Sequence, residues 1–265
     1  MKLFISPPFG NYTTCIKYMK FCNRHYEIVP IFGSYTIYPR KGLVLQTIKT
    51  LRYRSDLNGW TNKIGLRNKG LVHGIEHYNY MKSVNIDGIV SIAITDIESI
   101  PMITKLVDPK IPIEINISCP NINMSTNKNN IRKMLDFGLQ DFATQYQSNQ
   151  KSWCSIKLPH RCSLNIVDML YEAGFRQFHC SNTIPVKEGG LSGTAIIPYT
   201  SNLIRLIKQQ YNDVEIIING ENKFEKLFKD IESAKQHIHV EYYILKDDKI
   251  GTKFLELLLK KADQG

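Results

Sequence analysis

The stretch that decides the fold is Ile113-Glu114-Ile115-Asn116-Ile117-Ser118-Cys119-Pro120-Asn121. Its β-branched run predicts a buried strand, which ends where Ser, Cys, Pro and Asn follow. Pro120 cannot donate a hydrogen bond to a sheet and restricts the backbone of the residue before it, so Cys119 lies at the tip of the strand. A lone cysteine on an apolar strand is more often buried and inert than reactive. Here Asn116 and Asn121 flank the thiol, and their amides can hold a planar ligand without adding charge.

Composition predicts a folded protein with a large core. The chain has 265 residues, of which 43% are apolar and 22% charged. Lys and Arg number 34 against 24 Asp and Glu, which gives a net charge of +10. Such a charge suits anionic ligands or nucleic acid, or it reflects a composition rich in Lys, Ile and Asn with no partner involved. Because the lysines are scattered along the chain, we do not expect a nucleic-acid partner.

The cysteines and the N-terminal segment indicate the cellular compartment of the protein. The six cysteines form no C-x-x-C pair and no spacing with His that is typical of a metal site, so we expect neither a metal nor a disulfide framework. The apolar run at 3–5 is too short for a signal peptide, and no later stretch is long enough to span a membrane. We therefore expect a cytoplasmic protein with no membrane partner. The oligomeric state stays open, with a homodimer as one expectation.

Strand and helix patterns alternate along the whole chain. The expected strands cover 3–6, 28–32, 88–94, 113–117, 153–158, 175–179, 214–218 and 238–243. Helical patterns or loops with helices separate them, in a chain close to the ~250 residues of a (β/α)8 barrel. We expect, among others, a helix over 42–53, a turn with an irregular polar segment over 58–66 and one long helix over 127–146. An open doubly wound sheet is the competing α/β fold, but the turn after the first strand, at 7–11, lacks its Gly-rich pattern. We expect a single-domain (β/α)8 TIM barrel over residues 1–265.

Polar side chains follow several of these strands. The residues at strand ends are Ser34, Asn116, Cys119, Lys157, Asn182 and Thr183. Each one alone is an ordinary loop residue. Since the carboxyl ends of barrel strands meet at one edge, the set predicts a binding or catalytic site there.

Five segments resemble a known family in order and spacing. They are Asn62-Lys-Ile-Gly-Leu66, Asn116-Ile-Ser-Cys-Pro-Asn121, Ile156-Lys-Leu-Pro159, Ser181-Asn-Thr183 and Gly189-Gly-Leu-Ser-Gly193. Together they resemble the flavin-dependent dihydroorotate dehydrogenases, and the likeness spans nearly the whole chain. That family is an FMN-binding (β/α)8 barrel that oxidises dihydroorotate to orotate in pyrimidine synthesis. The Cys at the position of the catalytic base resembles the soluble class of this family. The segments at 33–36 and 189–193 are more similar to those of the membrane-associated class.

The resemblance implies a role for each matching residue. Cys119 would be the catalytic base, and Lys157 would stabilise negative charge on the reduced flavin. The substrate contacts would be Asn62, Gly65, Leu66, Asn116, Asn121, Asn182 and Thr183. The FMN contacts would be Ser34, Asn116, Lys157, Ser181, Gly193, Gly220 and Tyr242.

The chain departs from the family pattern at three places. Asn11 replaces a lysine, the segment 219–222 places Glu221 where the family has a Gly-rich phosphate turn, and Tyr243 replaces a small hydroxyl residue. At that place the carboxylate of Glu221 would repel a phosphate dianion. Two alternatives follow: a barrel of the same descent that lost FMN or turnover and acts as a binding or regulatory protein, and a flavoprotein similar to the tRNA dihydrouridine synthases.

Overall fold

The computed structural model describes residues 2–7, 9–22, 27–41, 50–63, 65–118, 127–147, 153–218, 232 and 249–263. Residue contacts divide the chain into two compact units, unit 1 (Met1–Ile217) and unit 2 (Ile218–Gly265). The division does not test whether 1–265 behaves as the single domain expected, and that expectation stays a prediction. No helix within the described ranges is long and apolar enough to cross a bilayer.

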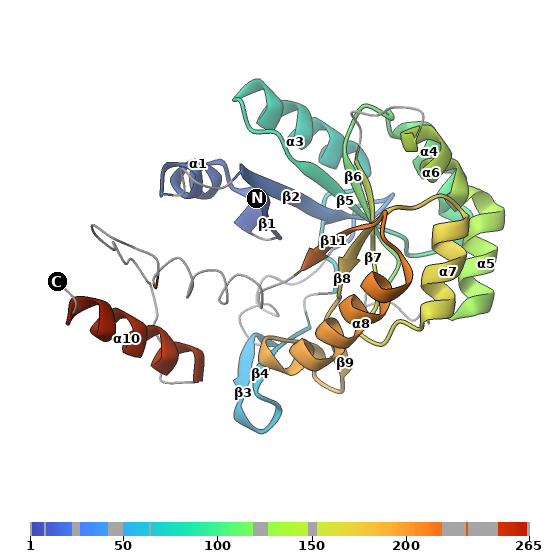
Figure 1. Cartoon of the computed structure of the whole chain (residues 1–265). Coiled ribbons are helices and arrows are strands. Elements are labelled where there is room, and N and C mark those ends of the chain that lie inside the picture. Colours follow the sequence, from blue (N-terminus) through green and yellow to red (C-terminus); the bar gives the residue numbers. More distant parts are fainter. Residues whose placement is uncertain are drawn as a thin grey trace. The chain divides into compact units, whose positions relative to one another are not determined.

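A seven-stranded, barrel-like sheet forms the centre of unit 1 (Figure 1). In spatial order its strands are β1 (Lys2–Ile5), β2 (Glu27–Tyr35), β5 (Ile89–Ala93), β6 (Ile113–Asn116), β7 (Cys154–Lys157), β8 (Gln177–Cys180) and β11 (Glu215–Ile218). Neighbouring strands from β1 to β8 pair in parallel. The mixed α/β class and seven of the expected strands are thus confirmed, and the eighth, at 238–243, lies outside the described residues.

Helices follow most strands and lie on the outside of the curved sheet in unit 1 (Figure 1). They are α1 (Thr13–Cys22), α3 (Leu71–Ser83), α4 (Ile100–Leu106), α5 (Lys128–Met134), α6 (Gln140–Gln147), α7 (Leu164–Glu172) and α8 (Ile197–Gln210); α10 (Lys249–Ala262) belongs to unit 2. A single helix was expected over 127–146, but the π-helical turn η4 (Leu135–Leu139) separates α5 from α6. The interruption centres on Gly138, whose φ of 105° suits a residue without a Cβ.

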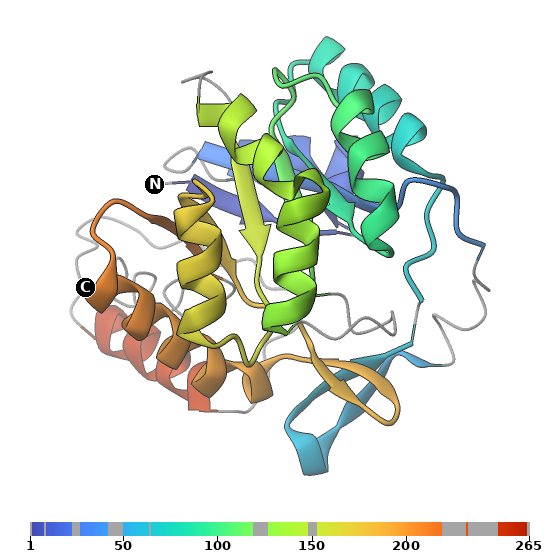
Figure 2. The same cartoon turned by 90° about the vertical axis from the view of Figure 1, so that its right-hand side faces the viewer.

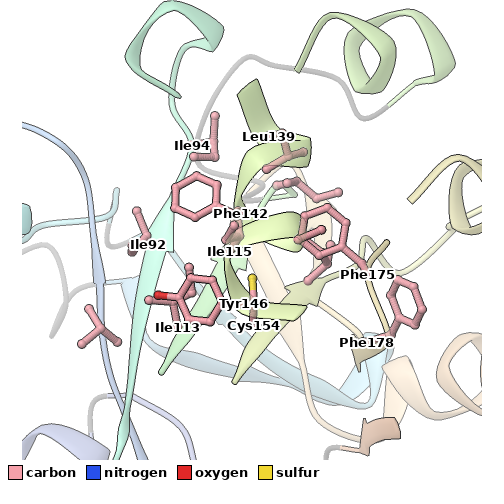
Figure 3. Packing of buried hydrophobic residues seen from close by; sticks show 14 of the residues in the cluster. Ile92, Ile94, Ile113, Ile115, Leu139, Phe142, Tyr146, Cys154, Phe175 and Phe178 are labelled. Carbon is pink, nitrogen blue, oxygen red and sulfur yellow. The ribbon is translucent and has the colours of Figure 1, made fainter. Parts of the chain in front are cut away.

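The core fills the space between these helices and the outer face of the sheet. Phe142 and Tyr146 of α6 point toward Ile113 and Ile115 of β6, with Ile92 of β5 beside them (Figure 3). All five side chains are buried, and each such side chain stabilises the fold by roughly 1.5–3 kcal/mol. The odd-numbered residues of β6 therefore face the helices, and the even-numbered residues face the other way.

A second, antiparallel sheet is formed by segments that connect strands of the parallel sheet to the helices that follow them. Its strand order is β3 (Arg52–Arg54), β4 (Gly59–Asn62), β10 (Gly189–Ser192) and β9 (Ile184–Val186). β3 and β4 lie between β2 and α3, and β9 and β10 lie between β8 and α8, so both pairs follow carboxyl ends of parallel strands. Figure 2 shows the two pairs side by side at one end of unit 1.

This second sheet corrects two expectations. A helix was expected to continue to residue 53, and 58–66 was expected to be irregular, yet 52–54 and 59–62 are strands. Gly190, Leu191 and Ser192 pair with residues 60–62 more than a hundred positions away. Such short polar strands exist because of this distant pairing, which local propensity does not contain.

Candidate functional site

Two rows of side chains cross the inner face of the parallel sheet, and all of them except Ala93 are polar. In register across β5, β6, β7 and β8, the rows are Ser91, Glu114, Ser155 and Gln177, and then Ala93, Asn116, Lys157 and His179. Parallel sheets normally bury apolar residues on both faces, so an inner face of this composition is exceptional. We call six of these residues the polar face: Ser91, Glu114, Asn116, Ser155, Lys157 and His179. Five are almost completely buried, and Lys157 is half-buried.

A chain of hydrogen bonds joins four strands across the polar face. Ser34 Oγ lies 2.8 Å from Ser91 Oγ, and Ser91 Oγ donates to Glu114 Oε1 at 2.8 Å. The other carboxylate oxygen of Glu114 lies 2.5 Å from His179 Nδ1. Buried charges persist only when paired and hydrogen-bonded, and both Glu114 oxygens have partners here.

The surroundings of Glu114 keep its carboxylate ionised. Burial by itself would raise the pKa of Glu114, but the charges of His179 and Lys157 and the hydrogen bonds from His179 and Ser91 outweigh it and lower the pKa to about 2. An ionised carboxylate only accepts hydrogen bonds, so the hydrogen between Glu114 and His179 resides on Nδ1. The imidazole is thereby fixed in orientation, as in other carboxylate–histidine pairs.

A cluster of amide side chains lies next to the polar face, at the carboxyl ends of β6, β7 and β8. Asn182 Nδ2 donates to Asn116 Oδ1 at 3.1 Å and to the Ser118 carbonyl oxygen at 3.0 Å. Ser118 Oγ donates to the Lys157 carbonyl oxygen at 3.1 Å, and the Asn182 N–H donates to the Leu158 carbonyl oxygen at 2.9 Å. The structure therefore brings together Asn116, Lys157 and Asn182, three residues named from the sequence.

The other described candidates lie around this cluster or in the second sheet. Thr183 N–H donates to Asn182 Oδ1 at 2.9 Å, and Ser181 Oγ lies 3.0 Å from Thr200 Oγ1. Asn62 belongs to β4 and donates to the Gly190 carbonyl oxygen at 3.4 Å. Three further candidates have positive φ angles: Gly65 (73°), Leu66 (57°) and Gly193 (100°). Asn62 thus belongs to the second sheet, and Gly193 follows its strand β10 directly.

Four candidates lie outside the described residues: Cys119, Asn121, Gly220 and Tyr242. The departures noted at 219–222 and at Tyr243 lie there too. The roles suggested for these residues stay predictions, and the site described here does not depend on them.

Sequence reasoning missed the most deeply buried members of the site. Glu114 and His179 were read as parts of apolar strands, and Ser91 and Ser155 were not singled out. The alternation Ile113-Glu-Ile-Asn-Ile117 was the available signal, because it places two polar side chains on one face of a strand whose other face is apolar.

Two surface cavities lie elsewhere on unit 1. One, of about 300 Å³, lies between α5 and α7 and is lined by Lys128, Arg132, Asp168 and Glu172 among others. The other, of about 550 Å³, lies beside η4, with Phe137 and Lys105 in its wall. Neither is lined by a residue of the polar face.

Comparison with known proteins gives short matches to one kind of enzyme. No family model matches the chain. A cardiolipin synthase of Oceanobacillus iheyensis is 44% identical over 59 residues, which is 22% of this chain and 12% of that protein. The major cardiolipin synthase ClsA of Bacillus subtilis is 46% identical over 54 residues, 20% of this chain and 11% of that enzyme. A cardiolipin synthase of Listeria welshimeri is 46% identical over 59 residues, with coverage of 22% and 12%. The chain spans about an eighth of the length of these relatives.

These matches overturn the family expected from the sequence. The relatives are named for cardiolipin synthesis, so the expected dihydroorotate dehydrogenase family is wrong, and with it FMN-dependent oxidation of dihydroorotate and a role in pyrimidine synthesis. The physical reason for the error is that the motifs used were short. Segments such as Ser181-Asn-Thr183 and Ile156-Lys-Leu-Pro159 describe strands that end in polar residues at a sheet edge, and unrelated α/β proteins build sites in that way too.

Proposed function

We propose that the chain takes part in phospholipid metabolism and that the polar face of unit 1 binds a phosphate-bearing, anionic group. The names of the cardiolipin synthase relatives support the first part. Unit 1 extends over Met1–Ile217, so most of it lies outside any one of those short matches. The second part therefore rests on the residues of unit 1.

One observation carries the binding site: Lys157 lies in register between Asn116 and His179 at the carboxyl end of β7. Ligands of open and closed α/β sheets bind outside the carboxyl ends of their strands. A lysine there, in a partly buried setting with amide donors beside it, attracts an anion more strongly than a solvated surface lysine does. The net charge of +10 favours an anionic partner in the same way.

We also propose that the parallel sheet closes into a barrel. Seven strands in a barrel-like arrangement, with a helix outside most of them, support a complete (β/α)8 barrel. In such a barrel the polar face lines the interior, and the second sheet stands at the mouth. A crystal structure with a flat, open sheet would contradict it.

FMN, the cofactor expected from the sequence, is a second phosphate-bearing molecule that we propose to test as a ligand. Its predicted contacts Ser34 and Ser181 are already hydrogen-bonded within the chain, to Ser91 and Thr200, and Lys157 is the predicted contact that carries a charge. Bound flavin would be seen directly as visible absorption of the purified protein. A protein that stays colourless after incubation with FMN and desalting would remove FMN from the proposal.

Vesicle binding tests the phospholipid function. The purified chain is sedimented at physiological salt with vesicles that contain cardiolipin, and with phosphatidylserine vesicles of equal charge. A protein of net charge +10 is attracted to both, so the expected result is stronger binding to cardiolipin. Equal binding to the two kinds of vesicle would show that charge alone is recognised and would overturn the proposal.

A matched pair of lysine variants assigns that preference to the polar face. Lys157→Met removes the charge at the end of β7, and Lys110→Met removes an exposed charge. We expect the preference for cardiolipin to fall in the first variant and to persist in the second. An equal loss in both variants would exclude the polar face as the binding site.

A further inference from the structure

The second sheet exposes two aromatic side chains on one of its faces. Tyr53 of β3 and Trp60 of β4 are paired in register, so both side chains lie on the same face. Their ring centroids are 5.6 Å apart, and the two residues are 46% and 40% exposed. Leu51, directly before β3, is 49% exposed. A cluster of large exposed apolar side chains is typical of a surface that meets a partner.

The opposite face of the second sheet is buried. Thr61 of β4 and Leu191 of β10 are paired in register on that face, and both are almost completely buried. Successive side chains of a strand point to opposite faces, so Trp60 points away from the interior on which Thr61 packs. The aromatic face is therefore the outward face of this sheet.

Ion pairs hold the strands of this face in place. We call residues 52–62, which comprise β3, the turn η2 (Ser55–Leu57) and β4, the aromatic hairpin. Arg54 lies 2.6 Å from the carboxylate of Asp56 and 2.8 Å from that of Glu188, in the turn between β9 and β10. A preformed surface loses less conformational entropy on binding than a flexible loop does.

Basic residues gather in the same segment. Between residues 50 and 69 the chain has one carboxylate, Asp56, and its cations are Arg52, Arg54, Lys63, Arg67 and Lys69. All of these cations except Arg54 are exposed. Cations near a bilayer are attracted by anionic headgroups, and tyrosine and tryptophan rings prefer the boundary between headgroups and acyl chains. The segment thus combines the two kinds of side chain that suit the surface of an anionic bilayer.

The aromatic hairpin stands at the same end of the parallel sheet as Lys157. It follows the carboxyl end of β2 along the chain, and its partner strands β9 and β10 follow the carboxyl end of β8. Lys157 is the last residue of β7, which runs parallel to β8. Figure 2 shows the hairpin reaching beyond the rest of unit 1.

We propose that the aromatic hairpin docks unit 1 on the surface of an anionic phospholipid bilayer. Tyr53 and Trp60 enter the headgroup layer, and the surrounding cations contact lipid phosphates. The inference rests on the proposed function and deepens it, because docking turns the carboxyl ends of the parallel strands toward the lipid headgroups. Aromatic and basic side chains also suit RNA, but the aliphatic Leu51 and the names of the cardiolipin synthase relatives favour a lipid.

The two tryptophans of the chain provide a direct test. Trp153 lies at the other end of the parallel sheet, directly before β7, with its ring centroid 5.8 Å from that of Phe4. Trp153→Phe therefore leaves a tryptophan on the aromatic hairpin, and Trp60→Phe leaves one at the opposite end. Each variant is mixed with vesicles of phosphatidylserine and brominated phosphatidylcholine, whose bromine atoms quench tryptophan fluorescence.

We expect the emission of Trp60 to move to shorter wavelength and to be quenched, and that of Trp153 to stay unchanged. Equal quenching of both tryptophans, or an unquenched Trp60 in a protein that sediments with the vesicles, would overturn the proposal. So would a protein that does not sediment with them, or one whose Trp60 responds to an RNA oligonucleotide and not to vesicles.

A matched pair of double variants measures the contribution of the aromatic rings. Tyr53→Ser with Trp60→Ser should weaken vesicle binding at least about tenfold, as expected when large apolar side chains no longer leave water. Tyr18→Ser with Phe21→Ser removes two exposed aromatic rings from α1 and should leave binding unchanged. Similar losses in the two double variants would contradict docking through the hairpin.

This proposal and the phospholipid function can fail separately. If the function is wrong but the docking surface is right, Trp60 is quenched while the chain shows no preference for cardiolipin over phosphatidylserine. If the docking surface is wrong, the cardiolipin preference persists in the double variant of Tyr53 and Trp60.

Discussion

Replacing Glu114 with glutamine is the most informative perturbation of the polar face. The change keeps the size and shape of the side chain but removes the charge that faces His179 and Lys157. Glu114 is 1% exposed, so solvent cannot replace the lost interaction. Removing one partner of a buried pair typically destabilises a protein by about 3–5 kcal/mol.

The lowered pKa of Glu114 expresses the same stabilisation as a dependence on pH. A folded-state pKa of about 2, against an ordinary value of 4.5, corresponds to about 3 kcal/mol of stability near neutral pH. Because the pKa is lowered on folding, this stability is fully present above pH 4.5 and is lost as the pH falls toward 2. By pH 3 the wild type should have lost about 2 kcal/mol through this residue alone.

Urea unfolding of wild type and Glu114→Gln at pH 7, 5 and 3 measures both effects. We expect the variant to be about 3 kcal/mol less stable at pH 7 and the gap between the two proteins to narrow to about 1 kcal/mol at pH 3. Glu98→Gln, at an exposed position, should change stability by less than about 0.5 kcal/mol at every pH. A gap for Glu114→Gln that is small at pH 7, or that does not change with pH, would refute the reasoning.

Three further substitutions test the frame around the polar face, each by its free energy of unfolding in urea. Gly33→Ala places a Cβ 2.7 Å from the Ser91 carbonyl oxygen at a φ of 116°, and should cost at least about 2 kcal/mol; a loss near zero would show that β2 can shift. Asn182→Ala removes the amide that joins β6 to the end of β8 and should cost about 1–3 kcal/mol, whereas the exposed Asn202→Ala should cost little; similar losses would contradict the cluster. Tyr146→Phe removes a buried 2.6 Å hydrogen bond to the Ile111 carbonyl oxygen and should cost about 1–2 kcal/mol, so an unchanged stability would argue against that contact.

The parallel strands were predictable because each carries β-branched or aromatic residues on at least one face and is followed by turn residues. The run 113–117 and the run 28–32 both correspond to observed strands, β6 and β2. β6 ends at Asn116, in agreement with the expectation that the strand ends before Pro120. Local composition was sufficient for these elements because β-branched residues favour the backbone of a buried strand.

Other features depend on contacts between distant residues. β3 and β10 are short and polar, and they form strands because β4 lies between them. The pairing of Glu114 with His179 joins residues 65 positions apart, so neither residue alone predicts it. The family resemblance failed for a related reason: short motifs at strand ends record the geometry of a sheet edge, whereas activity depends on the complete set of residues around the ligand.

Calorimetric titration with sn-glycerol 3-phosphate, using wild type, Lys157→Met and Lys110→Met, tests the central claim most directly. The account predicts that wild type and Lys110→Met bind with the same affinity and that Lys157→Met binds at least about tenfold more weakly, as expected for the loss of one charge-assisted contact. Equal binding by wild type and Lys157→Met would show that the inner face of the sheet is not where this protein meets its ligand.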